Sequence, residues 1–214
     1  MEGAHIPGGH RHPVAQGAAG TVRPGGRTAR TRARVLAAAG EILTEKGFTG
    51  LDLAQVAARA GVGRTTVHRR WGSAAALVAD LLQEATARPA LPRPTTGHLA
   101  ADLAACALHV RHALTHPAQA ALLRAAIAAA TFDPPTAGAL ARFYRACDAA
   151  WAPLVARAVA AGELPAGTDA AETVRAVCAP LAHRVVTGAV PSEQDALRAA
   201  RTALAAARAG AFTR

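Results

Sequence analysis

Apolar residues recur at intervals of three and four along most of the chain, which predicts amphipathic helices from about residue 27 to residue 208. The first predicted helix spans residues 27–46 and carries one apolar stripe. The members of this stripe are Val35, Leu36, Ala39, Ile42 and Leu43. Alanine is abundant and alternating β-branched runs are few, so we predict an all-α fold of about nine helices.

Two short helices follow, separated by a tight turn, at residues 52–60 and 64–71. Asp52 can cap the first of them, and Gln55 stands where the partner in a capping box belongs. Gly61 suits the turn at the end of the first short helix. Val67 and Trp71 are four residues apart, so they are expected to face the core from one side of the second helix. Two short helices joined by a glycine-containing turn are typical of a helix-turn-helix.

The second short helix carries side chains that can contact DNA in a groove. They are Arg64, Thr65, Thr66, His68, Arg69 and Arg70. Arginine can donate two hydrogen bonds to guanine, and threonine can contact a base edge or a thymine methyl group. A solvated basic helix without a partner is the alternative interpretation. The capped helix, the glycine turn and the basic helix, in this order, favour DNA binding.

Positive charge is concentrated around this segment. The 214-residue chain has a net charge of +10, and residues 27–72 contain nine Lys and Arg residues but only three acids. Such a local excess is typical of a surface that binds a polyanion.

The helix-turn-helix resembles the DNA-binding domain of the TetR family of transcriptional regulators. The matching positions are Val56-Ala57, Ala60-Gly61-Val62, Gly63, Thr66-Val67, His68, Trp71 and Leu77. His68 stands where the family usually has Tyr, which puts one phosphate contact in doubt. Ala74 replaces a common Lys and removes another such contact.

The resemblance implies a homodimer on a palindromic double-stranded operator, released by a small-molecule effector, and most often a repressor. Two-fold symmetry would place the half-sites about one helical turn apart. We expect base contacts from Arg64, Thr65, Thr66 and Arg69. Phosphate contacts are expected from His68, Arg70 and the cluster that begins with Arg27 and Arg30 and ends at Arg34, because this helix end lies near the DNA backbone in the family.

The chain divides into three predicted parts. Residues 1–26, rich in Gly, Pro and His, are predicted to be a disordered arm. Residues 27–88 form the helix-turn-helix domain with its connecting helix, and a proline-containing stretch marks the boundary. Residues 89–214 form a helical domain for ligand binding and dimerisation; residues 149–208 resemble the C-terminal domain of one TetR subgroup, whose last two long helices pair with those of a second subunit.

A ligand pocket is expected within this helical domain, because the resemblance places an effector site there. The candidate lining residues are Leu103, Cys106, Val110, Phe143, Tyr144, Cys147 and Trp151. Aromatic side chains often line such pockets, but at helical spacing they equally suit a plain core. A pocket of this composition favours an apolar or aromatic ligand.

Cys106, His109, His112 and His116 lie along one flank of a predicted helix and could bind zinc or copper. A polar flank beside the core is the favoured interpretation, so we expect no metal and no cofactor. No phosphate loop, zinc-protease motif or recognisable nucleophile is present, so we expect no enzyme activity. Three alternatives remain. They are a metal-responsive regulator, a metalloenzyme that uses the His109 flank, and a helical binding protein whose basic head docks on an acidic protein or membrane surface.

The three cysteines are widely separated in apolar surroundings, which argues against a disulfide framework and favours a reducing compartment. The sequence has neither an apolar signal segment near its start nor a long uncharged apolar run. We therefore expect a soluble cytoplasmic protein.

Overall fold

The computed structural model describes residues 26–87 and 96–214, which form nine α-helices and one short 3-10 helix. The N-terminal elements are α1 (Arg27–Lys46), η1 (Phe48–Gly50), α2 (Leu53–Ala60), α3 (Arg64–Trp71) and α4 (Ala74–Ala87). The others are α5 (Leu99–Thr115), α6 (Pro117–Ala130), α7 (Pro134–Ala160), α8 (Ala170–Val186) and α9 (Glu193–Arg208). The all-α prediction is confirmed: within the described ranges the only β pairing is an isolated bridge between Thr168 and Thr213. Residues 1–25 of the predicted arm and most of the proline-containing boundary lie outside the described residues.

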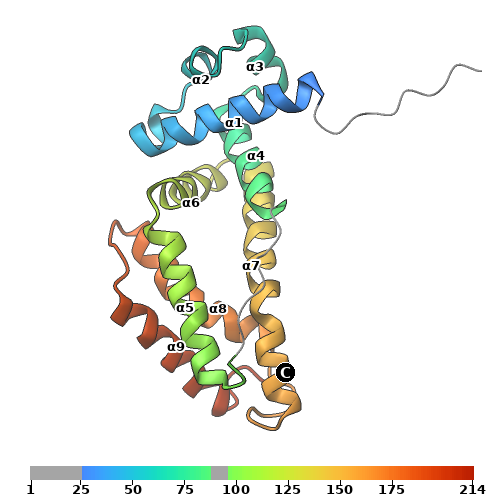
Figure 1. Cartoon of the computed structure of the whole chain (residues 1–214), viewed down its shortest axis with the longest axis vertical. Coiled ribbons are helices and arrows are strands. Elements are labelled where there is room, and N and C mark those ends of the chain that lie inside the picture. The colour runs from blue at the N-terminus through green and yellow to red at the C-terminus, as the bar shows by residue number, and fades with distance from the viewer. Residues whose placement is uncertain (1–25, 88–95) are drawn as a thin grey trace, which may run out of the picture.

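The molecule is elongated, with α1, α2 and α3 at one end and α5, α8 and α9 toward the other (Figure 1). We call residues 26–87 the head and residues 96–214 the body. The connecting helix α4 leaves the head and packs against the long helix α7, while α6 crosses beneath α1. The head therefore rests on α6 and on the N-terminal part of α7.

Side-chain caps explain where several helices begin. Asp52 accepts a hydrogen bond from the Gln55 N–H at 3.0 Å, as predicted for α2. The expected capping box is not completed, because the Gln55 side chain accepts a hydrogen bond from Lys46 Nζ at 2.8 Å instead. A complete box forms at α9, where Ser192 and Asp195 exchange hydrogen bonds.

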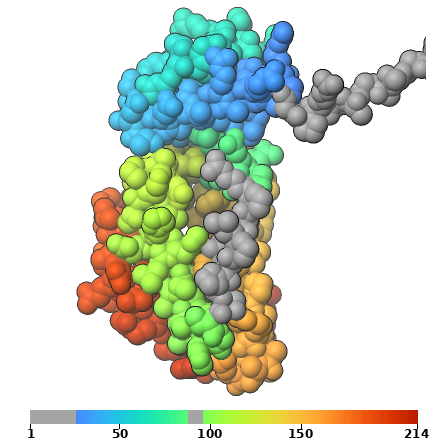
Figure 2. All heavy atoms as spheres, in the orientation of Figure 1, coloured from blue at the N-terminus to red at the C-terminus, as the bar shows by residue number. Residues whose placement is uncertain are grey.

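The buried apolar residues form two clusters, and the first joins the head to the body. It contains the inward residues of α1 to α4 together with residues of α6 and α7. The body members are Ala121, Ala125, Ala126 and Ala139. Because these side chains are small, the helices of the body can approach α1 and α4 closely, and Figure 2 shows the two parts in contact.

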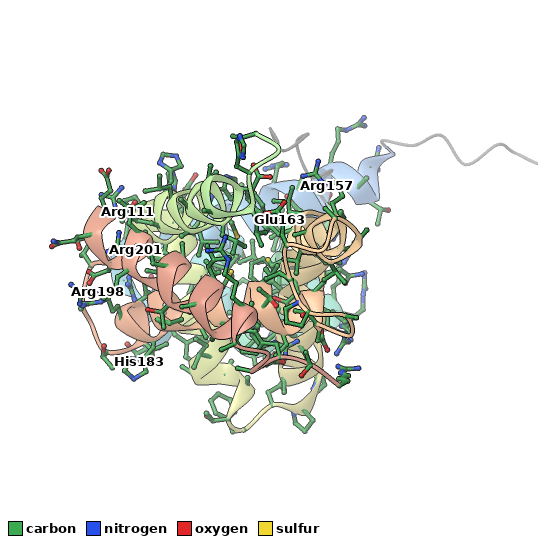
Figure 3. All side chains as sticks on the ribbon, turned by 90° about the horizontal axis from the view of Figure 1, so that it is seen from below. Arg111, Arg157, Glu163, His183, Arg198 and Arg201 are labelled. Atoms are coloured by element: carbon green, nitrogen blue, oxygen red, sulfur yellow. The ribbon has the colours of Figure 1, made fainter. Side chains whose placement is uncertain are left out.

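The second cluster holds α5, the C-terminal half of α7, α8 and α9 together. Its edge contains the buried carboxylate of Asp102, which accepts a hydrogen bond from the Thr96 N–H at 2.7 Å and pairs with Arg157 at 3.3 Å. On α9, Arg198 and Arg201 point away from the bundle (Figure 3).

Candidate nucleic-acid interface

The short helix α3 presents one side to the core and the other to solvent at the far end of the head (Figure 1). Val67 and Trp71, four residues apart, are buried as predicted. Thr65 and Arg69 are also four residues apart and project from the opposite side, where both are exposed. A helix that shows this side to solvent can enter a major groove, which is wide enough to admit it.

The remaining predicted residues of α3 flank this exposed side. Arg64, His68 and Arg70 are exposed, whereas Thr66 is half-buried. Among the described residues, no acidic side chain forms an ion pair with Arg64, Arg69 or Arg70. The charges of these three guanidinium groups therefore remain available to an anionic partner.

The predicted arginine cluster at the start of α1 divides into two kinds. Arg27 and Arg30 are exposed near the first turn, where they can face a phosphate backbone. Arg32 and Arg34 make contacts within the head that the sequence pattern did not indicate. The first turn of α1 contains no acid, so exposed cations here are unfavourable unless an anion approaches them.

Arg34 supports the turn that joins α2 to α3. Its guanidinium donates hydrogen bonds to the carbonyl oxygens of Ala60 and Gly61, the latter at 3.0 Å. Gly61 adopts φ 60° and ψ 42°, the left-handed conformation that favours glycine. A Cβ atom at this position would also lie 2.6 Å from Arg34 Nη2. The turn thus favours glycine for its backbone conformation, while a Cβ here would require only the flexible end of the Arg34 side chain to shift.

A second contact joins α1, α3 and α4. Asp80 on α4 accepts hydrogen bonds from Arg32 Nη2 at 2.6 Å and from the Trp71 indole N–H at 3.0 Å. The hydrogen bond to Asp80 raises the pKa of Arg32 above its already high value. Arg32 also donates to Glu84 at 3.3 Å. Arg32 is 48 residues from Asp80 and 52 from Glu84 in the chain, so local periodicity could not predict these pairs.

Part of the positive charge of the head is compensated internally. Arg59 pairs with Glu45 at 2.7 Å, and this hydrogen bond holds the pKa of Glu45 below its ordinary value. A longer contact of 3.7 Å joins Arg59 to Glu41. Arg32 and Arg59 are thus paired with acids inside the head, whereas the arginines of α3 are not among the described ion pairs.

Comparison with known families matches both parts of the chain. Residues 35–81 match the family described as "Bacterial regulatory proteins, tetR family", and residues 93–204 match a "Tetracyclin repressor-like, C-terminal domain". The chain belongs to the TetR family. It is a helix-turn-helix transcriptional regulator of a family whose members are typically ligand-responsive repressors.

Individual relatives agree with this membership. The uncharacterized HTH-type transcriptional regulator YdeS of Bacillus subtilis is 29% identical over 74% of this chain and 80% of its own length. The HTH-type transcriptional regulator AqdR of Rhodococcus erythropolis is 32% identical over 67% and 68%. A TetR transcriptional regulator from Agrobacterium tumefaciens shares the fold, with a TM-score of 0.65, 22% identity and coverage of 87% and 95%.

The candidate pocket residues of this TetR-family chain lie in two different surroundings. Leu103, Cys106 and Trp151 are buried in the second cluster, with Val110 packed at its margin. Phe143 packs instead against the first cluster. Phe143 and Trp151, the first and last pocket candidates on α7, therefore pack against different clusters.

Tyr144 and Cys147 lie between these ends and are half-buried. The Tyr144 ring meets Phe143 edge to face, with centroids 5.9 Å apart. Burial raises the pKa of the Tyr144 hydroxyl above its ordinary value. The thiols of Cys147 and Cys178 add smaller contributions to this rise in the pKa.

Two hollows are lined by described residues. An open groove of about 500 Å³ runs between α1 and α4, with Ala118 of α6 at its edge. A cavity of about 150 Å³ lies at the far end of the body among Asp102, Arg157 and Glu163, the last two of which are labelled in Figure 3. Neither includes a residue of the predicted ligand pocket.

The histidine flank of α5 is exposed, while Cys106 on the same helix is fully buried. His109 lies against Trp151, with ring centroids 5.7 Å apart. Across residues 26–87 and 96–214, no three His, Cys, Asp or Glu side chains are gathered closely enough to hold a metal ion. The flank therefore gives the metal-binding alternative no geometric support.

No helix in the described parts of the chain is long and apolar enough to cross a membrane.

Proposed function

We propose that this TetR-family regulator is a homodimeric repressor that binds a palindromic operator through α3 and leaves it when a small molecule binds the body. The observation that carries the proposal is the exposed side of α3, where Thr65 and Arg69 project together on a helix anchored by Val67 and Trp71. A rigid helix with unpaired arginines can distinguish base edges as well as attract phosphates.

Several residues have distinct proposed roles. Arg64, Thr65, Thr66 and Arg69 contact bases, and His68 and Arg70 contact phosphates on either side. Arg27 and Arg30 add phosphate contacts from the start of α1, where both are exposed. These contacts divide into those that specify sequence and those that fix position.

The proposed division of labour follows the domains expected from the sequence. Residues 27–88 bind DNA and residues 89–214 bind the effector and form the dimer. Val186 and Val190, which are exposed apolar residues at the end of α8 and just beyond it, support a subunit interface on this side. A two-fold dimer of this kind matches a two-fold operator.

Release by an effector follows from linkage. A ligand that binds one arrangement of the body more tightly than another shifts the population toward that arrangement, and the coupling to DNA is reciprocal. The effector site is proposed among Leu103, Cys106, Val110, Phe143, Tyr144, Cys147 and Trp151, and its composition favours an apolar or aromatic molecule. The contacts of α6 and α7 with the head give this shift a route to α3.

A protein that acts in this way works where the chromosome lies, so we propose a cytoplasmic location. The proposed function requires neither a cofactor nor a catalytic group.

The first test is fluorescence anisotropy of the purified full chain on DNA flanking its own gene, with scrambled DNA of equal length, over a series of salt concentrations. Specific protein–DNA complexes have dissociation constants of roughly 10⁻⁸–10⁻¹¹ M and exceed non-specific binding by about a thousandfold or more. We expect the protein to bind one of the two duplexes as a dimer, with a dissociation constant in this range. Equal binding of both duplexes, lost steeply with salt, would show phosphate attraction without sequence recognition.

A further inference from the structure

The carboxylate of Asp80 lies at the point where α1, α3 and α4 meet. It accepts the indole N–H of Trp71 at 3.0 Å on one oxygen and Arg32 Nη2 at 2.6 Å on the other. Arg32 Nε adds a hydrogen bond of 3.1 Å. One side chain of the connecting helix therefore holds both the first helix and the last residue of the recognition helix.

The hydrogen bond from Trp71 fixes the C-terminal end of α3. Trp71 is the last residue of this eight-residue helix, and its side chain is buried beside Val67. The guanidinium of Arg70 lies over the same ring, 5.0 Å from its centroid, and is exposed on the other side. The position of the indole therefore also orients a cation proposed to contact phosphate.

The charge of Arg32 makes its hydrogen bonds to Asp80 stronger than bonds between neutral groups would be. Hydrogen bonds in which a partner is charged are shorter and roughly twice as strong as neutral ones. The Arg32 and Asp80 side chains are partly shielded from water, with 28% and 19% of their surfaces exposed. The Arg32–Asp80 pair thus holds the carboxylate in the orientation that Trp71 requires.

We propose that Asp80 is a positioning residue that fixes the recognition helix α3 to the connecting helix α4, and so sets how the DNA-contacting side of α3 is presented to the operator. This inference deepens the proposed operator binding and rests on it. Asp80 does not touch DNA; it acts through Trp71 and, with Arg32, sets the angle between the helices. The expected effect is therefore on specificity rather than on general attraction to DNA.

If only charge mattered, removal of Asp80 would raise the affinity for DNA. Loss of an acid makes the head more positive, and Coulomb attraction would then strengthen binding to any DNA. Loss of the Trp71 anchor instead weakens binding to the operator while leaving non-specific binding unchanged or slightly stronger. The ratio of specific to non-specific affinity separates the two effects.

The test compares Asp80→Ala, Trp71→Phe and the double variant with the full-length wild type. Each binds the duplex that wild type selects from random DNA and a scrambled duplex, at a temperature where circular dichroism shows the variant folded. We expect the specificity ratio to fall about tenfold in each single variant, and the double variant to be no worse than Asp80→Ala. Glu84→Gln is the matched control, because Glu84 is a second carboxylate partner of Arg32 on α4; its ratio should stay within about twofold of wild type.

Amide hydrogen exchange of the free proteins gives a readout that does not depend on DNA. We expect faster exchange across residues 64–71 in Asp80→Ala and Trp71→Phe, with residues 53–60 unchanged and Glu84→Gln like wild type. If wild type selects no duplex, the proposed function fails, and the exchange of α3 still decides the role of Asp80. Unchanged exchange in α3, additive losses in the double variant, or an equal loss in Glu84→Gln would each overturn the inference.

Discussion

The rings of Phe48 and Phe132 lie with their centroids 6.2 Å apart, and they join the head to the body. Phe48 belongs to η1, directly after α1, whereas Phe132 lies in the turn between α6 and α7. Aromatic pairs at this separation are attractive beyond the apolar area that they bury. The contact therefore contributes to holding the head on the body although Phe132 itself is 65% exposed.

Replacement of Phe132 by alanine should weaken the attachment of the head. We expect the free energy of unfolding to fall by about 1 kcal/mol, and the effect to shrink when Phe48 is already alanine. Urea unfolding of the two single variants and the double variant measures this coupling. Phe132→Leu is the control, because it keeps an apolar side chain but has no ring. If Phe132→Leu loses as much stability as Phe132→Ala, the effect belongs to the ring pair. Additive losses in the Phe48 and Phe132 double variant would exclude a coupling between the rings.

Thr136 makes a second connection between the parts. Its buried hydroxyl lies 3.1 Å from the carbonyl oxygen of Ala75 on α4 and 2.6 Å from Asp133 Oδ2. Thr136→Val has nearly the same shape but no hydroxyl, so it removes the one hydrogen bond that the hydroxyl proton can make, at an expected cost of about 0.5–1.5 kcal/mol. Asp133 Oδ2 keeps the hydrogen bond from the Thr136 N–H at 2.9 Å. Thr136→Ser keeps the hydroxyl and should lose less than Thr136→Val in thermal unfolding. The reverse order would show that packing of the methyl group matters more than the hydrogen bond.

Gly61→Ala should destabilise the head by roughly 1–2 kcal/mol, because the left-handed backbone at this position disfavours a residue with a Cβ atom. Gly40 is the matched control: it lies inside α1, and a Cβ there meets nothing within 4 Å. Gly40→Ala should stabilise the protein by about 0.5–1 kcal/mol through helix propensity. In thermal unfolding, the midpoint temperature should fall for Gly61→Ala and rise for Gly40→Ala. Equal shifts of the two midpoints would contradict the role assigned to the turn.

Arg69→Ala and Arg59→Ala remove the same formal charge from the head, but only Arg59 has acidic partners within it. We expect Arg69→Ala to weaken operator binding by about 1–3 kcal/mol and to relax base preference at one position. Arg59→Ala should change binding by less than about threefold, because its charge is already compensated. Equal losses in anisotropy titrations would mean that net charge, rather than the surface of α3, governs binding.

Stability at low pH should depend on Asp195. Hydrogen bonds from the Ser192 side chain and N–H, together with Arg184, hold the pKa of Asp195 below its ordinary value. A lowered folded-state pKa means that this contribution is fully present above the unfolded value, about 3.9, and is lost as pH falls through the folded value. Asp195→Asn should therefore flatten the loss of stability below about pH 4, measured by urea unfolding. Glu193→Gln removes an acid from the same turn that makes none of these contacts, and it should keep the wild-type slope; a wild-type slope in Asp195→Asn would contradict the prediction.

The head shows how far periodicity and turn chemistry could predict the fold. The bounds of α1 and α3 agree with the pattern, and α2 begins one residue after its cap, because stripes such as Val35 and Ile42 and the glycine at 61 are local signals. The partners of Arg32 and Arg34 were not predictable in this way. Arg32 meets Asp80 from another helix, and such pairing depends on how helices cross rather than on the sequence beside either residue.

The candidate effector site was less predictable for the same reason. Phe143 and Trp151 are eight residues apart on α7, and helical spacing places them on related sides. Their neighbours differ because α7 runs past both clusters, so one packs toward the head and the other toward α5, α8 and α9. Sequence spacing specifies a side of one helix, whereas a pocket depends on which helices surround it.

The most direct test of operator recognition by α3 is a methylation-interference footprint of the wild-type dimer on the duplex that it selects. We expect two patches of guanine N7 interference in the major groove, related by two-fold symmetry and about one helical turn, roughly 34–36 Å, apart. In Arg69→Ala, the guanine that Arg69 contacts should drop out of the patch in each half-site, while the other contacts of the patch remain. Interference that lacks symmetry, or that is identical in wild type and Arg69→Ala, would contradict base recognition by this helix.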